Sequence, residues 1–132
     1  MNNFIKIRNY NRNKIISSLK KSKQWNNQFS FFKINKNVTP SFFGFPVILN
    51  KRYLGKRNRY LKKLSKDGVE SRPIISGNFL RQPVAKTFKL DKEKNKFKNA
   101  DDVQNLGFFI GLHTKKIKAK ILKKLVKALL KI

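Results

Sequence analysis

The charge imbalance is the feature that most constrains this chain. Its 132 residues include 33 Lys and Arg but only 6 Asp and Glu, which gives a formal net charge of +27. Residues 1–66 and 115–132 contain no acidic residue, so neither segment neutralises its own positive charge. Such a chain folds only around an apolar core, and 39% of its residues are hydrophobic, including 12 Phe. We therefore expect one folded domain.

The positive charge bears on the kind of partner as well. A surplus of this size is typical of proteins that bind nucleic acid or an anionic surface. The basic residues are mainly Lys, whereas proteins that read bases favour Arg, whose planar fork pairs with guanine edges. Biased base composition also explains many lysines, because Lys, Asn, Ile and Phe share A/T-rich codons. The charge thus leaves open a small basic protein that binds nucleic acid without sequence specificity.

Missing residue types exclude several kinds of site. The chain has no Cys, which rules out disulfides, zinc–thiolate sites and thiol nucleophiles, and His113 is its single histidine. Asp101 and Asp102 fit the first turn of a helix better than an acid–base pair. No catalytic or metal-binding residue is therefore predicted. The sequence shows no signal peptide and no membrane-spanning run, so we expect a cytoplasmic protein.

Hydrophobic spacing predicts an α+β fold, with a small antiparallel-type sheet of about three strands covered by helices. Asn99 is the predicted N-cap of a short helix, and Thr114 that of the last helix. The expected elements are helix 4–24, edge strand or extended linker 28–37, buried strand 41–49, amphipathic helix 51–66, strand 69–75, irregular segment 79–88, exposed loop 89–98, helix 99–104, strand 108–110 and a helix over the C-terminal residues.

The C-terminal helix allows two interpretations. Its apolar residues form two adjacent rows, and its remaining face is nearly all lysine; the rows are Ile117, Ile121, Leu125, Leu129 and Leu122, Val126, Leu130. A lysine-rich amphipathic helix over residues 115–132 would suit a membrane surface. A helix that docks on its own domain gives the same pattern, and we favour this second interpretation.

Residues 71–83 are the segment most typical of a binding site. Arg72, Asn78 and Arg81 lie around Gly77, where a predicted strand turns into a loop. Arginine stays charged and pairs with oxyanions through two hydrogen bonds, so we expect Arg72 and Arg81 to face one cleft and hold one anionic ligand. In the alternative, the loop is an ordinary turn and each arginine pairs with an acid such as Glu70 or lies in solvent. The scarcity of acids argues against such pairing.

Four separated motifs occur in a recognisable order: SFFGFPV (41–47), DGVESRPI (67–74), GNFLRQP (77–83), and NAD (99–101) with GFFIGL (107–112). This order resembles the C-terminal small domain of the DegT/DnrJ/StrS family. Its members are pyridoxal-phosphate-dependent sugar aminotransferases and related nucleotide-sugar dehydratases with the aspartate aminotransferase fold. The third motif resembles the 3-dehydratase-type members most.

The resemblance implies a substrate-closing C-terminal domain over residues 41–132, preceded by a linker helix and extended segment over 1–40, all within a single domain. It implies a nucleotide-sugar substrate in surface-polysaccharide sugar biosynthesis, contacted by Arg72, Asn78 and Arg81. In the family a large domain holds pyridoxal phosphate and the Schiff-base lysine (histidine in the dehydratases), and its motifs are not found here. The resemblance therefore implies a truncated or split chain that needs a cofactor-binding domain or partner chain. We expect no covalent cofactor on this chain alone and assign no Schiff-base role to Lys115.

Overall fold

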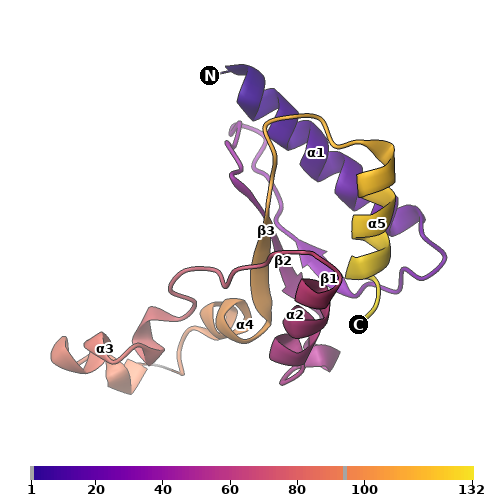
Figure 1. The fold of residues 1–132 in the computed structure, drawn as a ribbon. Helices are drawn as coiled ribbons and strands as arrows, with labels where there is room; N and C mark the ends of the chain where they lie inside the picture. Colours follow the sequence, from indigo (N-terminus) through magenta and orange to yellow (C-terminus); the bar gives the residue numbers. More distant parts are fainter. Residues whose placement is uncertain (1, 94) are drawn as a thin grey trace.

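The computed structural model describes residues 2–93 and 95–132 and has an α+β architecture (Figure 1). Three antiparallel strands form a sheet in the order β1-β2-β3, which confirms the predicted fold class. The elements are α1 (Asn2–Lys21), β1 (Phe29–Phe31), β2 (Gly44–Leu49), η1 (Lys51–Tyr53), α2 (Arg57–Lys66), η2 (Phe79–Arg81), α3 (Val84–Thr87), η3 (Asp91–Glu93), α4 (Lys98–Leu106), β3 (Gly107–Gly111) and α5 (Ala119–Leu129). Among the described residues, no helix is long and apolar enough to cross a membrane.

The central strand β2 sets the two faces of the sheet. It pairs with β1 through Phe29 opposite Leu49, and with β3 through Phe45 opposite Ile110. Alternate residues of a strand point to opposite faces, so Phe45, Val47 and Leu49 share the buried face. The uninterrupted apolar run that predicted this strand reflects a sheet in which both faces are at least partly covered.

The main core lies between the sheet and three helices. Helices α1, α2 and α5 lie around the sheet, with α5 beside α1 (Figure 1). The core cluster includes Ile15 and Leu19 from α1, Tyr60 and Leu64 from α2, Phe29, Phe45, Val47, Leu49, Phe108 and Ile110 from the strands, and Ala128, Leu129 and Leu130 at the end of α5. The apolar side of the C-terminal helix is thus docked on its own domain. This confirms the favoured interpretation of its amphipathic pattern, although Ile121 stays 53% exposed.

The strand predicted over 69–75 is wrong. Only Arg72 pairs there, in an isolated antiparallel bridge with Phe109. Pro73 follows directly and has no N–H to donate, so the pairing cannot extend as a regular ladder. The third strand of the sheet is instead β1, which lies within the segment predicted to be an edge strand or a linker.

Three helix boundaries also differ from prediction. The helix expected over 51–66 is divided, because Gly55 has a φ of 76° between η1 and α2. Helix α4 begins at Lys98 after Phe97, so Asn99 lies inside it and is not the N-cap. Helix α5 begins only at Ala119 after Lys118, so Thr114 is not its cap. The buried Asn11 of α1 holds residues 113–117 in an irregular path through three hydrogen bonds, which delays the helix.

Candidate functional site

Gly77 brings the loop after Ile74 into close contact with helix α4. Its φ is 63°, a backbone conformation that L side chains rarely adopt. A Cβ at this position would lie 2.8 Å from the Cβ of Gln104. The approach of loop and helix therefore requires glycine here, and the residues that follow bond Asp101 and Gln104 of α4.

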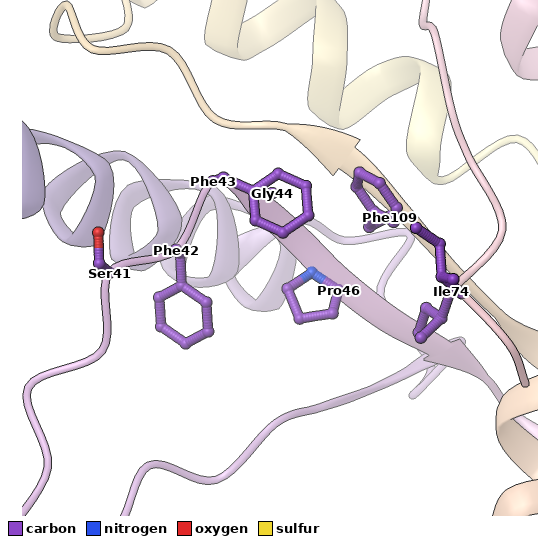
Figure 2. Close-up of a pocket in the computed structure, with 8 residues that line it drawn as sticks. Ser41, Phe42, Phe43, Gly44, Pro46, Ile74 and Phe109 are labelled. Carbon is purple, nitrogen blue, oxygen red and sulfur yellow. The ribbon is translucent and has the colours of Figure 1, made fainter.

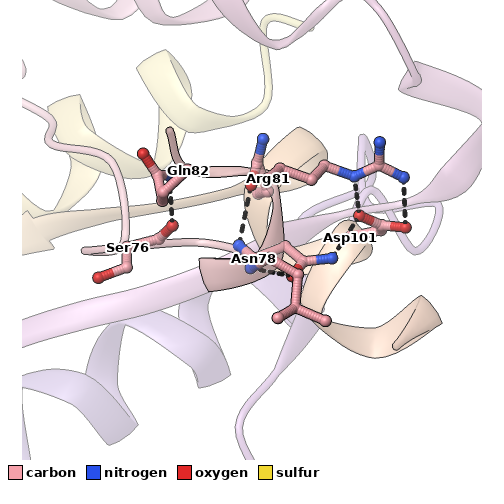
Figure 3. A network of polar contacts seen from close by, with 7 residues as sticks. Ser76, Asn78, Arg81, Gln82 and Asp101 are labelled. Carbon is pink, nitrogen blue, oxygen red and sulfur yellow. Dashed lines mark hydrogen bonds and ion pairs between the residues drawn. The ribbon is translucent and has the colours of Figure 1, made fainter. Parts of the chain in front are cut away.

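Asn78 anchors this loop from the inside. Its side chain is buried, with 1% of the residue exposed, and its amide group both accepts and donates a hydrogen bond (Figure 3). The Oδ1 atom accepts a hydrogen bond of 3.0 Å from the backbone N–H of Leu80, and Nδ2 donates to Asp101 Oδ1 at 2.8 Å. The backbone N–H of Asn78 donates to Gln104 Oε1 at 2.9 Å. These bonds fix the loop to α4.

Arg81 completes this network through the same carboxylate. Its Nη2 donates to Asp101 Oδ2 at 2.9 Å, and its Nε donates to Oδ1, as Figure 3 shows. The hydrogen bonds from Arg81 first, and from Asn78 second, lower the pKa of Asp101 to about 2. The same bond with Asp101 raises the pKa of Arg81. Two of the three predicted binding residues are therefore brought together, around an acid that they already share.

Arg72 lies apart from that network and pairs with a different acid. Its backbone forms the bridge to Phe109, with N–H···O distances of 2.9 and 2.8 Å. Its guanidinium bonds Glu70 Oε1 from Nη2 at 2.7 Å and from Nε at 3.1 Å. The Arg72 side chain is 70% exposed and that of Glu70 is 77% exposed, so this pair is weak and open to exchange. Acids are scarce in this chain, yet both arginines pair with one, so the expectation that they stay unpaired was wrong.

An apolar cavity of about 400 Å³ lies on the sheet face opposite the main core (Figure 2). Phe43 and Phe109 form one wall, with their ring centroids 5.2 Å apart and an edge-to-face angle of 74°. Gly44 is required beneath them, since a Cβ there would lie 2.5 Å from Phe109 Cδ2. The lining residues are Ser41, Phe42, Phe43, Gly44, Pro46, Ile74, Ile75 and Phe109, so the cavity borders the strand position where Arg72 is paired.

A second cavity, of about 370 Å³, lies beside α2 and α4. Arg57 lines it and donates from Nη1 to the carbonyl oxygens of Gln104 at 2.6 Å and Gly107 at 2.9 Å. A cation at these carbonyls stabilises the end of α4. The sequence does not predict this role, because nothing in it separates Arg57 from its many basic neighbours. Neither cavity is lined by Arg72, Asn78 or Arg81, so a shared cleft for the two arginines stays a prediction.

Comparison with solved structures identifies the class of fold. The structure of Escherichia coli GDP-4-keto-6-deoxy-D-mannose 3-dehydratase with bound hydrated PLP superposes with a TM-score of 0.71. The superposition covers 96% of this chain and 31% of that one, at 24% sequence identity. A structure of the same kind of enzyme with bound GDP-perosamine gives the same TM-score and coverage. The fold is therefore that of one part of a nucleotide-sugar dehydratase.

The sequence relatives include the same dehydratase. The GDP-4-keto-6-deoxy-D-mannose 3-dehydratase of Yersinia pseudotuberculosis is 34% identical over 73 residues, which cover 55% of this chain and 19% of the relative. The enzyme of Escherichia coli O55:H7 is 36% identical over 74 residues, with the same coverage. Lipopolysaccharide biosynthesis protein RfbH of Salmonella typhimurium is 31% identical over 74 residues. The matched region is thus about a fifth of the length of these relatives. No family model matches the chain.

The chain is similar to the C-terminal part of GDP-4-keto-6-deoxymannose 3-dehydratase, a pyridoxal-phosphate-dependent enzyme of the DegT family. This confirms the resemblance inferred from the four motifs. The relatives from Yersinia pseudotuberculosis and Escherichia coli are dehydratases rather than aminotransferases, in line with the interpretation of residues 77–83.

The two cavities described above do not fit pyridoxal phosphate. Neither is lined by a lysine or a histidine that could carry or face a Schiff base, and every lysine whose side chain is described is exposed. Lys115 and His113 lie in the exposed segment before α5. Among the described residues there is also no group of three or more His, Asp or Glu that could hold a metal ion.

Proposed function

We propose that this chain is the substrate-closing C-terminal domain of a pyridoxal-phosphate-dependent nucleotide-sugar 3-dehydratase, acting in lipopolysaccharide sugar biosynthesis. The observation that carries the proposal is the superposition of 96% of the chain on one part of such an enzyme. Identity of 34–36% over more than half of the chain supports it. A fold alone would leave the function open. Here the likeness in structure and the likeness in sequence are to the same kind of enzyme.

The proposal includes a cofactor-binding partner. In this proposal the cofactor is held by a second domain or chain, since neither of the two described cavities is lined by a residue suited to it. The role of this chain is to close over the substrate and exclude water. Residues 1–40 supply α1 and the edge strand β1 of this domain, and in this proposal they also lead to the cofactor-binding part.

Within the domain, Arg72 is the foremost proposed contact for the negative charge of the nucleotide sugar. Its exposed pair with Glu70 costs little to break, and a diphosphate offers it a stronger, charge-assisted partner. Asn78 and Arg81 are proposed to support the substrate from the neighbouring loop. Because both already bond Asp101, their first task is to hold that loop rigid against α4.

A chimera tests the proposal. The C-terminal part of the Yersinia pseudotuberculosis dehydratase is replaced by this chain, and conversion of GDP-4-keto-6-deoxy-D-mannose is followed. The controls are the parent enzyme and the parent without its C-terminal part. We expect the chimera to turn over the substrate while the shortened parent does not. A chimera that folds and holds its cofactor, as its absorbance reports, but is no more active than the shortened parent would contradict the proposal.

A further inference from the structure

The positive charge is concentrated in the helices that cover the main core. Helices α1, α2 and α5 contain no acidic residue, whereas each has at least one lysine in its last turn. The carboxylates that form ion pairs in the described part of the chain lie outside these helices, at Asp67, Glu70, Glu93, Asp101 and Asp102. The helical side is therefore strongly attractive to a polyanion.

One point on this side combines cations with an exposed ring. Tyr10 of α1 is 40% exposed, and the ammonium groups of Lys14 and Lys116 lie over its ring at 5.6 and 5.3 Å from the centroid. Lys14 is one turn along the same helix, whereas Lys116 comes from the segment before α5. Two like charges at one ring repel each other, so an anion that bridges them is stabilised.

We call Tyr10, Lys14 and Lys116 the cation–tyrosine cluster. The neighbouring residue Asn11 holds the cluster together. Its buried side chain donates from Nδ2 to the carbonyl oxygens of His113 at 3.0 Å and Lys115 at 2.9 Å. Its Oδ1 accepts from the N–H of Ile117 at 2.9 Å. These bonds fix the backbone on both sides of Lys116, so the lysine is held beside α1 by the fold.

We infer that the cation–tyrosine cluster is a docking point for single-stranded nucleic acid. A nucleotide supplies both complementary groups: its phosphate draws Lys14 and Lys116 away from the ring of Tyr10, and its base stacks on the ring in their place. Lysine rather than arginine suits contacts to phosphate without base reading. An anionic membrane is less suited, because the apolar residues at the end of α5 are buried in the core and not free to insert. The inference does not depend on the proposed enzyme function.

Fluorescence anisotropy with a labelled oligo(dT) of about 20 nucleotides tests the inference on the whole chain. The Tyr10→Leu variant should weaken binding about tenfold, because base stacking on the ring is lost. The Lys14→Gln/Lys116→Gln variant should reduce the slope of log affinity against log salt by about 1.4, since each single-strand phosphate contact contributes about 0.7. Circular dichroism verifies that the variants stay folded.

Matched controls separate a specific cluster from net charge. Lys86→Gln/Lys98→Gln removes the same charge from exposed positions on α3 and α4, which lie far from α1 and α5 (Figure 1). Phe88→Leu removes an aromatic ring that is 61% exposed beside α3. We expect both controls to bind like the wild type. Equal losses in the control and cluster variants, an unchanged affinity in Tyr10→Leu, or binding to phosphatidylserine vesicles but not to the oligonucleotide would each overturn the inference.

Discussion

Arg81 and Asp101 form an ion pair in which both carboxylate oxygens accept a hydrogen bond, and this pair ties the loop after Gly77 to helix α4. The side chains are partly covered, with 36% of Arg81 and 20% of Asp101 exposed. The pair of Arg72 with Glu70 is far more open. The two predicted arginines therefore differ in kind: Arg81 is held in the fold, and Arg72 is free to exchange its partner.

The Arg81–Asp101 pair should make stability depend on pH in the acid range. Its bonds lower the pKa of Asp101 from 3.8 to about 2, so the stabilisation is fully present above the unfolded value and is lost as the pH falls from about 4 to about 2. We expect Asp101→Asn to be less stable than the wild type at pH 7, by urea unfolding, and this difference to shrink between pH 4 and 2. Asp102→Asn is the control. Asp102 pairs with Lys51, whose side chain is 77% exposed, so its substitution should change stability less. A difference that stays constant down to pH 2 would contradict this account.

Asn11 should be one of the most sensitive polar positions in the chain. Asn11→Ala removes the bonds to His113, Lys115 and Ile117 and leaves their backbone groups without this partner. We expect a loss of about 1–3 kcal/mol in the free energy of unfolding. Asn3→Ala is the control, since Asn3 is also an asparagine of α1 but is exposed. Equal stability of the two variants would show that Asn11 does not hold the segment before α5.

Gly77→Ala should destabilise the loop more than the same change at Gly68. Both glycines have positive φ, 63° and 79°, so each substitution carries a backbone cost of about 1 kcal/mol. A Cβ at Gly68 meets open space, but one at Gly77 lies 2.8 Å from the Cβ of Gln104. The larger fall in thermal midpoint is thus expected for Gly77→Ala. Equal falls at the two positions would mean that the loop moves away from α4 without cost.

Local sequence pattern predicted the elements that depend on local properties. The apolar run 41–49 predicted β2, and the helical spacing after residue 50 predicted α2 apart from the break at Gly55. The strand over 69–75 was wrong, because Pro73 lacks the N–H that a longer ladder needs and the pairing stops at the single bridge of Arg72.

The parts that the sequence could not predict are contacts between distant residues. Asn11 bonds residues more than 100 positions away, and Asp101 lies 20 residues from Arg81. The apolar cavity likewise joins residues 41–46 with Ile74, Ile75 and Phe109, which only the folded sheet brings together. Because composition shows how many acids exist and not where they lie, it could not reveal that both arginines are paired.

The most direct test of the substrate site is the KM of the dehydratase chimera for GDP-4-keto-6-deoxy-D-mannose when Arg72 is changed. Arg72→Ala removes an exposed side chain, so the thermal midpoint should stay unchanged. The account predicts that KM rises about ten- to a hundredfold, as expected for the loss of one charge-assisted contact. Arg59→Ala, which removes another exposed arginine, from α2, is the control and should leave KM unchanged. An Arg72→Ala chimera with the KM of the unsubstituted chimera would contradict the proposed role of this domain in holding the substrate.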